Sequence, residues 1–312
     1  MTQKLIAVVG PTATGKTALA VALARTLGGE IVGADSRQVY RHMDIGTAKP
    51  TPEERSLARH HLIDVIDPDQ EFSLAQYLEL AVAALEGVWS RGKQPLLVGG
   101  SGQYVWALLE GWRVPRLPPQ RELRRELEER AARHGPEALH RELAKVDPKA
   151  AARIDPRNVR RVIRALEVHR ATGRPISYWQ EKGPPPWQTL ILGLTCPRQE
   201  LYRRIDARVD AMIEAGLADE VRRLLAMGYE PSLPSLSGIG YSQVCQHLAG
   251  ELSLAAAVAR IKTATHRLVR QQYTWFRLDD ERIRWLEGAV AVDEAMALAE
   301  GFLEKSAHTA AR

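Results

Sequence analysis

The sequence GPTATGKT at residues 10–17 directly follows the apolar run LIAVV at residues 5–9. It has the spacing G-x-x-x-x-G-K-[ST], in which glycines let backbone N–H groups face an anion at the start of a helix. Chance matches to so short a motif occur, but here a predicted strand precedes it and a helix predicted over residues 16–27 follows it. This is the structural context that a phosphate-binding loop requires, and it indicates an α/β fold.

The loop also indicates a metal ion, whereas a later strand argues against hydrolysis of a nucleoside triphosphate. Lys16 supplies a positive charge to phosphate oxygens, and the Thr17 hydroxyl is placed to bind Mg²⁺. Enzymes that hydrolyse nucleoside triphosphates usually carry a metal-binding Asp at the end of a later apolar strand. The strand predicted over residues 94–100 instead continues into Ser-Gly, with no carboxylate.

The rest of the first hundred residues alternates apolar runs with helical patterns, which is typical of a parallel sheet covered by helices. A second strand is predicted over residues 30–35, ending at Asp35, and helices over residues 73–91 and 102–109, the first with Ser73 as its N-cap. The pattern then changes to consecutive helices separated by Gly-Pro and Asp-Pro pairs, predicted over residues 121–135, 136–146, 147–154 and 158–173.

A strand pattern resumes over residues 189–196, and the chain after residue 198 reads as mostly helical. The predicted fold class is therefore α/β, a P-loop parallel sheet covered by helices, with a helical insertion domain. The predicted catalytic core comprises residues 1–112 and 188–312, and the insertion comprises residues 113–187.

Charge is concentrated in the predicted insertion. Residues 113–187 contain 18 Lys and Arg against 10 Asp and Glu, a net charge of +8, whereas the whole chain carries +5. A basic block in an otherwise near-neutral chain is a candidate nucleic-acid surface. A solvated helical face explains the same charge, so charge alone leaves both interpretations open.

Composition narrows the class of protein. No apolar run approaches the roughly 20 residues of a membrane span, and the first residues lack the layout of a signal peptide. Cys196 and Cys245 stand alone, which indicates neither a disulfide framework nor a zinc site. We expect a cytoplasmic protein of bacterial type, with no membrane partner.

Two polar residues follow predicted strands on the same edge of the sheet. Because ligands of open parallel sheets bind beyond the carboxyl ends of the strands, Asp35 and Ser101 should both face the phosphate-binding loop. A lone Asp after a strand is more often a turn former or a helix cap, and that alternative stays open for Asp35 when it is considered alone.

The longer string DSRQVYRHMDIGTAKP at residues 35–50 resembles, nearly residue for residue, the hallmark of the tRNA dimethylallyltransferases, the isopentenyl transferases that modify tRNA. The resemblance runs in order from the phosphate-binding loop to about Leu278. It includes GGSGQY from Gly99, where the family usually has GGTGLY, and then RVIRALEV from Arg161, the segment 196–221, GIGYSQV from Gly238 and TWFR from Thr274.

This resemblance implies a prenyltransferase that moves a dimethylallyl group from its pyrophosphate to N6 of the adenosine just 3′ of the anticodon, position 37, and releases pyrophosphate. By the same resemblance Asp35 is the general base that accepts the N6 proton, and the Ser101 hydroxyl lies near the adenine. The expected partners are the tRNA anticodon stem-loop and dimethylallyl pyrophosphate, with Mg²⁺ as cofactor and a monomeric protein.

The resemblance also implies the binding residues. Those for pyrophosphate are Gly10, Thr12, Ala13, Thr14, Gly15, Lys16, Thr17 and Arg208, with Mg²⁺ at Thr17. Those for tRNA are Asp35, Ser36, Arg37, Gln38, Ser101, Arg160, Arg161 and Arg164.

Several of these residues have a simpler explanation when the residues are considered alone. Arg208 would be a solvated helix charge, and the resemblance reverses that interpretation. Helical spacing puts Arg160 and Arg164 on one face, with Arg157 a turn before, whereas Arg161 should point away as a surface charge.

The segment before TWFR departs from the family pattern. The family commonly has T-R-x-x-A-K-R-Q there, whereas this chain has THRLVRQQ at residues 265–272, so His266 and Gln271 stand where Arg is usual. Arg267 and Arg270 are close enough in the sequence to compensate.

Three other functions are weighed against transfer to tRNA. An enzyme that prenylates free adenine nucleotides would need no basic insertion. A small-molecule P-loop kinase, with Asp35 activating a hydroxyl, would lack the string at residues 35–50. A P-loop protein that binds RNA without catalysis would be favoured had Lys16, Thr17 or Asp35 been replaced.

Overall fold

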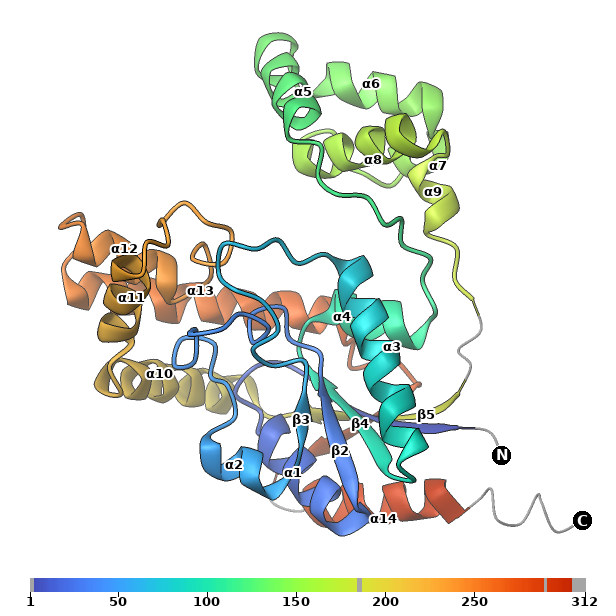
Figure 1. Ribbon diagram of the computed structural model, residues 1–312, viewed down its shortest axis with the longest axis vertical. Coiled ribbons are helices and arrows are strands. Elements are labelled where there is room, and N and C mark those ends of the chain that lie inside the picture. Colours follow the sequence, from blue (N-terminus) through green and yellow to red (C-terminus); the bar gives the residue numbers. More distant parts are fainter. Residues whose placement is uncertain (1–2, 184–186, 289–290, 305–312) are drawn as a thin grey trace, which may run out of the picture. The chain divides into compact units, whose positions relative to one another are not determined.

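The computed structural model describes residues 3–183, 187–288 and 291–304, and the chain divides into two compact units (Figure 1). The core unit comprises residues 1–73, 77–109 and 186–312. The insertion unit comprises residues 74–76 and 110–185, and so contains most of the insertion predicted from the sequence.

The core unit is built on a parallel sheet of six strands in the order β3-β2-β4-β1-β5-β6. All six residues of the central strand β1 are buried, because it is covered on both faces and paired on both edges. The predicted α/β class is confirmed. The strands are β1 (Lys4–Val9), β2 (Gly29–Gly33), β3 (His60–His61), β4 (Gln94–Gly99), β5 (Gln188–Thr195) and β6 (Ile283–Glu287).

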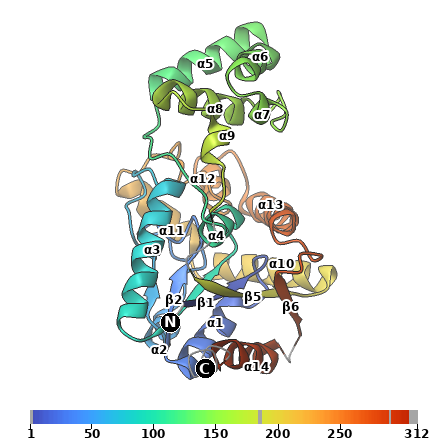
Figure 2. The same cartoon turned by 90° about the vertical axis from the view of Figure 1, so that its right-hand side faces the viewer.

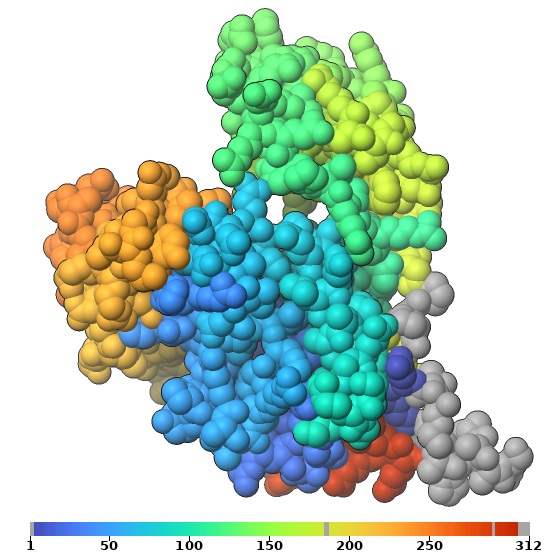
Figure 3. All heavy atoms as spheres, in the orientation of Figure 1, coloured from blue at the N-terminus to red at the C-terminus, as the bar shows by residue number. Residues whose placement is uncertain are grey.

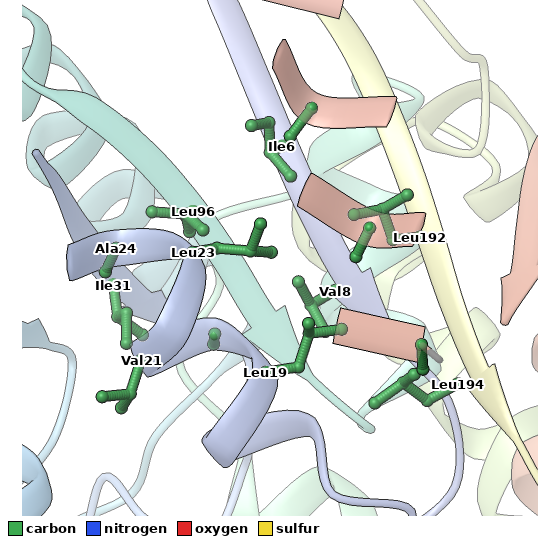
Figure 4. Packing of buried hydrophobic residues seen from close by; sticks show 14 of the residues in the cluster. Ile6, Val8, Leu19, Val21, Leu23, Ala24, Ile31, Leu96, Leu192 and Leu194 are labelled. Atoms are coloured by element: carbon green, nitrogen blue, oxygen red, sulfur yellow. The ribbon is translucent and has the colours of Figure 1, made fainter. Parts of the chain in front are cut away.

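Helices surround this sheet. Figures 1 and 2 both show α14 beside α1, and the two helices pack together on one face of the sheet. Figure 4 shows the apolar cluster between α1 and the sheet, in which Leu19 and Leu23 of α1 lie over the strands that carry Val8 and Leu96. The helices are α1 (Lys16–Leu27), α2 (Pro52–Leu57), α3 (Leu74–Ser90), α4 (Gly102–Leu109), α10 (Arg198–Glu214), α11 (Leu217–Ala226), α12 (Tyr241–Leu248), α13 (Leu254–Trp275) and α14 (Ala291–Glu304).

A second apolar cluster holds α10 to α13 against the segment that follows β2. It includes Val39, Met43, Ile205 and Val221, all nearly inaccessible to solvent. In the space-filling view of Figure 3, the blue segment that contains residues 44–46 lies against the orange helices α11 and α12. The string at residues 35–50 is therefore part of the core packing as well as of the surface.

The insertion unit is a small helical bundle with its own apolar core, which includes Leu127, Leu143 and Val162. Its buried carboxylate Glu167 accepts hydrogen bonds from Arg124 and from the backbone N–H of Gln120. Its helices are α5 (Arg121–His134), α6 (Pro136–Val146), α7 (Pro148–Ala151), α8 (Val159–Thr172) and α9 (Ile176–Trp179).

Some elements differ from the predictions. β2 ends at Gly33 and not at Asp35, because the Asp35 side chain accepts the Arg37 backbone N–H and closes a turn there. The helix predicted over residues 147–154 is only the single turn α7 (Pro148–Ala151). The sequence did not predict β3, β6, α2 or α9, which are all short.

The described ranges contain no helix long and apolar enough to cross a membrane.

Candidate active site

The phosphate-binding loop joins β1 to α1 and depends on backbone conformations that favour glycine. Gly10 has φ of +134°, and a Cβ there would lie 2.4 Å from the carbonyl oxygen of Leu194. Gly15 has φ of +92° and is the N-cap of α1, so the loop turns directly into the helix. Ala13 also has positive φ, which is uncommon for a residue with a Cβ.

Hydrogen bonds inside the loop occupy several of its polar groups. The Pro11 carbonyl accepts the Thr14 hydroxyl at 2.9 Å and the Lys16 ammonium at 2.7 Å. The backbone N–H of Thr12 donates to Oε1 of Gln272 at 2.9 Å, so it does not face an anion in this arrangement. The half-buried Thr17 hydroxyl has no hydrogen-bond partner among the described residues.

Lys16 and Arg208 form a positive pair close to Asp35. Burial, and next the charge of Arg208, lower the pKa of Lys16 to about 8, while Asp35 acts in the opposite direction. Burial also lowers the pKa of Arg208, which is half-buried and has no hydrogen bond or ion pair in the part of the chain that the structure describes. Two neighbouring cations without a paired carboxylate among the described residues favour an anionic ligand.

Asp35 and Ser101 lie side by side at the carboxyl ends of β2 and β4. The Ser101 backbone N–H donates to the Ala34 carbonyl at 3.2 Å, and the Ser101 hydroxyl accepts the Ser36 N–H at 3.0 Å. Asp35 accepts the Arg37 N–H through Oδ1 at 2.8 Å and has no other hydrogen bond among the described residues. The carboxylate is therefore both a turn former and available to a ligand.

A cavity of about 480 Å³ is lined by part of the predicted set, whereas Lys16 and Thr17 do not line it. Asp35, Ser101 and Arg208 line it, as do Thr12, Ser36 and Arg37. One part of its wall is apolar and suits a hydrocarbon: Ile205, Val209, Met212, Ile239, Tyr241, Ile261, Leu268 and Trp275.

Two predicted RNA-binding residues in the core unit are held by the protein itself. Nη1 of Arg37 donates to the Pro234 carbonyl at 2.9 Å, although the side chain still lines the cavity. Nε2 of Gln38 donates to the carbonyls of Thr47 and Ala48 at 3.2 and 3.1 Å, and Gln38 does not line the cavity. In this arrangement Gln38 shapes the segment that lines the cavity.

The cavity wall also depends on residues that the sequence analysis did not single out. Glu220 is buried and accepts the backbone N–H groups of Asp44, Ile45 and Gly46, as well as the Tyr241 hydroxyl at 2.6 Å. A Cβ at Gly46 would lie 2.5 Å from the Tyr241 ring. Gly46 belongs to the string IGTAKP and Tyr241 to the string GIGYSQV. Neither string by itself indicates that these residues meet at Glu220.

The arginines predicted to bind RNA from the insertion lie on α8. Arg160 and Arg161 are exposed, and neither side chain forms an ion pair among the described residues. Arg164 is paired with the buried Glu167 at 2.6 Å. Arg157 lies before the helix, which begins at Val159, and pairs with Asp155, so it does not extend the helical face as predicted.

The two departures from the family pattern fall on opposite sides of α13. Gln271 lines the cavity. His266 stacks on Tyr202 with ring centroids 4.1 Å apart, and its Nε2 lies 2.9 Å from a carboxylate oxygen of Asp206. The described residues contain no group of three His, Cys, Asp or Glu side chains that could hold a metal ion alone.

The chain is similar to several known proteins. A family model described as IPP transferase matches residues 38–279. The tRNA dimethylallyltransferase of Chloroflexus aurantiacus is 58% identical over 275 residues, covering 88% of this chain and 93% of that protein. The tRNA dimethylallyltransferase of Herpetosiphon aurantiacus is 52% identical over 300 residues, covering 95% of both chains.

Solved structures extend the similarity. The tRNA isopentenylpyrophosphate transferase of Bacillus halodurans is 40% identical with a TM-score of 0.73, covering 99% of this chain and 100% of that one. A eukaryotic dimethylallyltransferase acting on tRNA is 27% identical with a TM-score of 0.84, covering 97% of this chain and 80% of that one.

Proposed function

The chain belongs to the IPP transferase family, and we propose that it transfers a dimethylallyl group from dimethylallyl pyrophosphate to N6 of the adenosine that follows the anticodon in tRNA. The observation that carries the proposal is the single cavity lined by Asp35, Ser101 and Arg208, next to the phosphate-binding loop. A base, a hydroxyl and a cation thus surround one space that also has an apolar wall.

The donor pyrophosphate would lie between the loop and α10. The backbone N–H groups at the start of α1 and the cations Lys16 and Arg208 would bind it, since neither cation is neutralised by a paired carboxylate. Negative charge builds up on the pyrophosphate as the allylic C–O bond breaks. The same groups therefore stabilise the leaving group more strongly in the transition state than in the ground state.

The residues of the loop fit a Mg²⁺ ion that would bind the pyrophosphate together with the protein. Thr17 offers a half-buried hydroxyl with no partner among the described residues, and Mg²⁺ prefers oxygen ligands and retains several waters. Because the described carboxylates form no cage, most of the other ligands would be pyrophosphate oxygens and water. When bound, the ion would neutralise charge on the pyrophosphate.

The acceptor adenine would enter the same cavity after leaving the base stack of the RNA, because a stacked base cannot be reached. N6 is a weak nucleophile, since its lone pair is delocalised into the ring. Asp35 would accept the N6 proton as the new N–C bond forms, through the carboxylate oxygen that the Arg37 N–H does not occupy. The Ser101 hydroxyl would orient the adenine, and it is itself fixed by the Ser36 N–H.

The RNA surface would include the insertion unit. Arg160 and Arg161 are exposed and free of ion pairs among the described residues, as phosphate contacts require. Arg164 would act less directly, because its guanidinium already binds Glu167. We propose that one chain is sufficient for catalysis, because Lys16, Asp35, Ser101 and Arg208 all belong to one core unit.

One assay tests this function against its rivals. Purified protein is incubated with labelled dimethylallyl pyrophosphate, Mg²⁺ and either tRNA or AMP, without any nucleoside triphosphate. We expect label in tRNA only. Label in AMP alone would favour an enzyme that prenylates free adenine nucleotides. An absolute requirement for ATP would favour a kinase-like step. ATP added to the working reaction should compete with the prenyl donor for the phosphate-binding loop.

A further inference from the structure

A second cavity, of about 760 Å³, lies outside the candidate active site. It is at the carboxyl ends of β5 and β6, between the first turn of α10 and the last turns of α13, and it shares no lining residue with the first cavity. Ligands of open parallel sheets bind beyond the carboxyl ends of the strands, and the volume is within the range of small-molecule sites.

Two guanidinium groups in this cavity have no acidic partner. Arg198 and Arg270 donate to the same Tyr202 hydroxyl oxygen, at 3.2 and 3.1 Å. Within the described ranges neither arginine forms an ion pair, since Glu200, on the same turn as Arg198, binds Arg203 and Arg204 instead. Two positive charges therefore converge on one neutral oxygen.

The remaining charges of the cavity do not cancel this pair. Arg277 also lines the cavity, but it is bound to Asp279 at 2.8 Å. Glu287 lines the far end, at the last residue of β6, and has no ion pair among the described residues. Hydrogen bonds from Arg270 and Arg198 lower the pKa of the Tyr202 phenol, although slight burial raises it, which reflects the excess of positive charge.

Tyr202 is held in place from both sides. Its ring stacks on His266, with centroids 4.1 Å apart, and the Arg198 guanidinium lies 5.2 Å from the ring centroid. The phenol O–H and the two guanidiniums are therefore gathered as hydrogen-bond donors at one place. Guanidinium groups bind carboxylate and phosphate oxygens through two parallel hydrogen bonds, and a phosphomonoester, with a charge of about −2, matches two guanidiniums in charge.

The rest of the lining is mainly apolar. Leu201 and Val269 are buried beneath the cavity, and Leu278 is 60% exposed at its edge. The Tyr273 ring is fixed by a hydrogen bond of 2.8 Å between its hydroxyl and Thr195. A ligand that fills this space must combine an anionic group with an apolar or aromatic body.

We propose that this cavity binds an organic phosphomonoester, with its phosphate on Arg198, Arg270 and Tyr202 and its apolar or aromatic body against Tyr273 and Leu278. A nucleoside monophosphate and a short prenyl monophosphate share this chemistry. The same two helices line both cavities, since α10 contributes Arg198 here and Arg208 to the active site.

Calorimetric titration of the full chain with UMP, isopentenyl monophosphate and inorganic phosphate tests the proposal. UMP is chosen because it has no N6 amine and no pyrophosphate. We expect one equivalent of UMP or of isopentenyl monophosphate to bind more tightly than inorganic phosphate, and the tighter of the two identifies the source. Arg198→Ala and Arg270→Ala should each weaken binding about tenfold or more, the effect of losing a hydrogen bond to a charged group.

Three further variants make the result specific. Arg203→Ala removes an exposed arginine of the same helix that is paired with Glu200, and should leave binding unchanged. Leu278→Glu adds a negative charge at the cavity edge without disturbing buried residues, and should weaken binding. Lys16→Ala should leave binding unchanged, because the phosphate-binding loop takes no part.

The proposal is overturned if neither organic phosphate binds, or if binding is lost in Lys16→Ala but kept in Arg198→Ala. It is equally overturned if Arg198→Ala weakens tRNA binding alone, since the arginine pair then belongs to an RNA surface. No prenyl transfer is measured in the titration, so a failure here is distinct from a failure of the proposed enzymatic function.

Discussion

The backbone N–H of Thr12 donates a hydrogen bond to Oε1 of Gln272, and Nε2 of the same side chain donates to the carbonyl of Gly100, at 2.9 and 3.0 Å. One side chain of α13 therefore joins the phosphate-binding loop to the turn that holds Ser101. A Cβ at Gly100 would lie 2.5 Å from that Nε2, so the turn must pass close to Gln272. The phosphate-binding loop and the turn that holds Ser101 are thus fixed to each other.

Replacing Gln272 should affect both substrates. Gln272→Ala removes two hydrogen bonds in a site where the side chain is nearly buried, and should lower the free energy of unfolding by about 1–3 kcal/mol. The KM for dimethylallyl pyrophosphate and the KM for tRNA should rise together. Gln272→Glu still accepts the Thr12 N–H but can no longer donate a hydrogen bond to the Gly100 carbonyl. Its effect on the KM for dimethylallyl pyrophosphate should therefore be smaller. Urea denaturation and steady-state kinetics give the two measurements, and a change in only one KM would refute the link.

Asp35 should be needed for the chemical step and little for binding. Asp35→Ala should slow single-turnover transfer by roughly 10²–10⁴-fold at saturating tRNA, the usual contribution of a general base. Asp35→Asn is the matched control, because its amide oxygen can still accept the Arg37 N–H and keep the turn. An equal loss of transfer rate in both variants would indicate that the Asp35 carboxylate acts as the general base. Near-normal transfer by Asp35→Asn would show that the carboxylate only shapes the turn.

Donor binding should weaken as pH rises through about 8. The pKa of Lys16 is lowered to about 8, so the ammonium that attracts pyrophosphate is present below this pH and is lost above it. The donor dissociation constant should therefore increase between pH 7 and 9, measured by calorimetry without tRNA. Lys16→Arg keeps its charge across this range and should remove the dependence. An identical pH profile for Lys16→Arg would assign the titration to another group.

The insertion arginines should separate into two kinds. Arg160→Ala should weaken tRNA binding and lower the slope of log affinity against log salt by about 1, as for one lost phosphate contact. Arg164→Ala leaves the buried Glu167 with Arg124 and the Gln120 N–H, and should also destabilise the insertion unit by about 1–3 kcal/mol. Filter binding at several salt concentrations and thermal unfolding distinguish the two. Unchanged salt slopes for Arg160→Ala would remove α8 from the RNA surface.

Local sequence patterns predicted the elements that position the loop. The helix predicted over residues 16–27 is α1 with the same bounds, because Gly15 and Gly28 both adopt positive φ and limit it on each side. The strands on either side of β1 were equally predictable, since each is a continuous apolar run. β3 and β6 were missed because they have only two and five residues, and the buried positions of β6 lie three residues apart and do not give the alternation typical of a strand.

Long-range pairing was beyond the sequence. Glu167 and Glu220 read as ordinary charges on helices, yet both are buried and satisfied by groups far away in the chain. Arg164, predicted to bind tRNA, is paired with Glu167, and the sequence did not reveal this because it gave no sign that Glu167 is buried. Lys16 and Thr17 were predictable from the loop spacing, and Asp35 and Ser101 from their places at the ends of predicted strands, whereas Arg208 as a pyrophosphate ligand came from the family resemblance alone. The roles of all these residues remain predictions.

The position of β1 in the middle of the sheet has a consequence for biosynthesis. β1 pairs with β4 on one side and with β5 on the other, and the insertion unit lies between those two partners in the chain. At about 5–20 residues per second, roughly 5–20 s separate the synthesis of Gly99 from that of Thr195. During this interval the nascent chain carries an unsatisfied apolar strand edge, the feature that promotes aggregation, while the insertion helices can already form from local contacts.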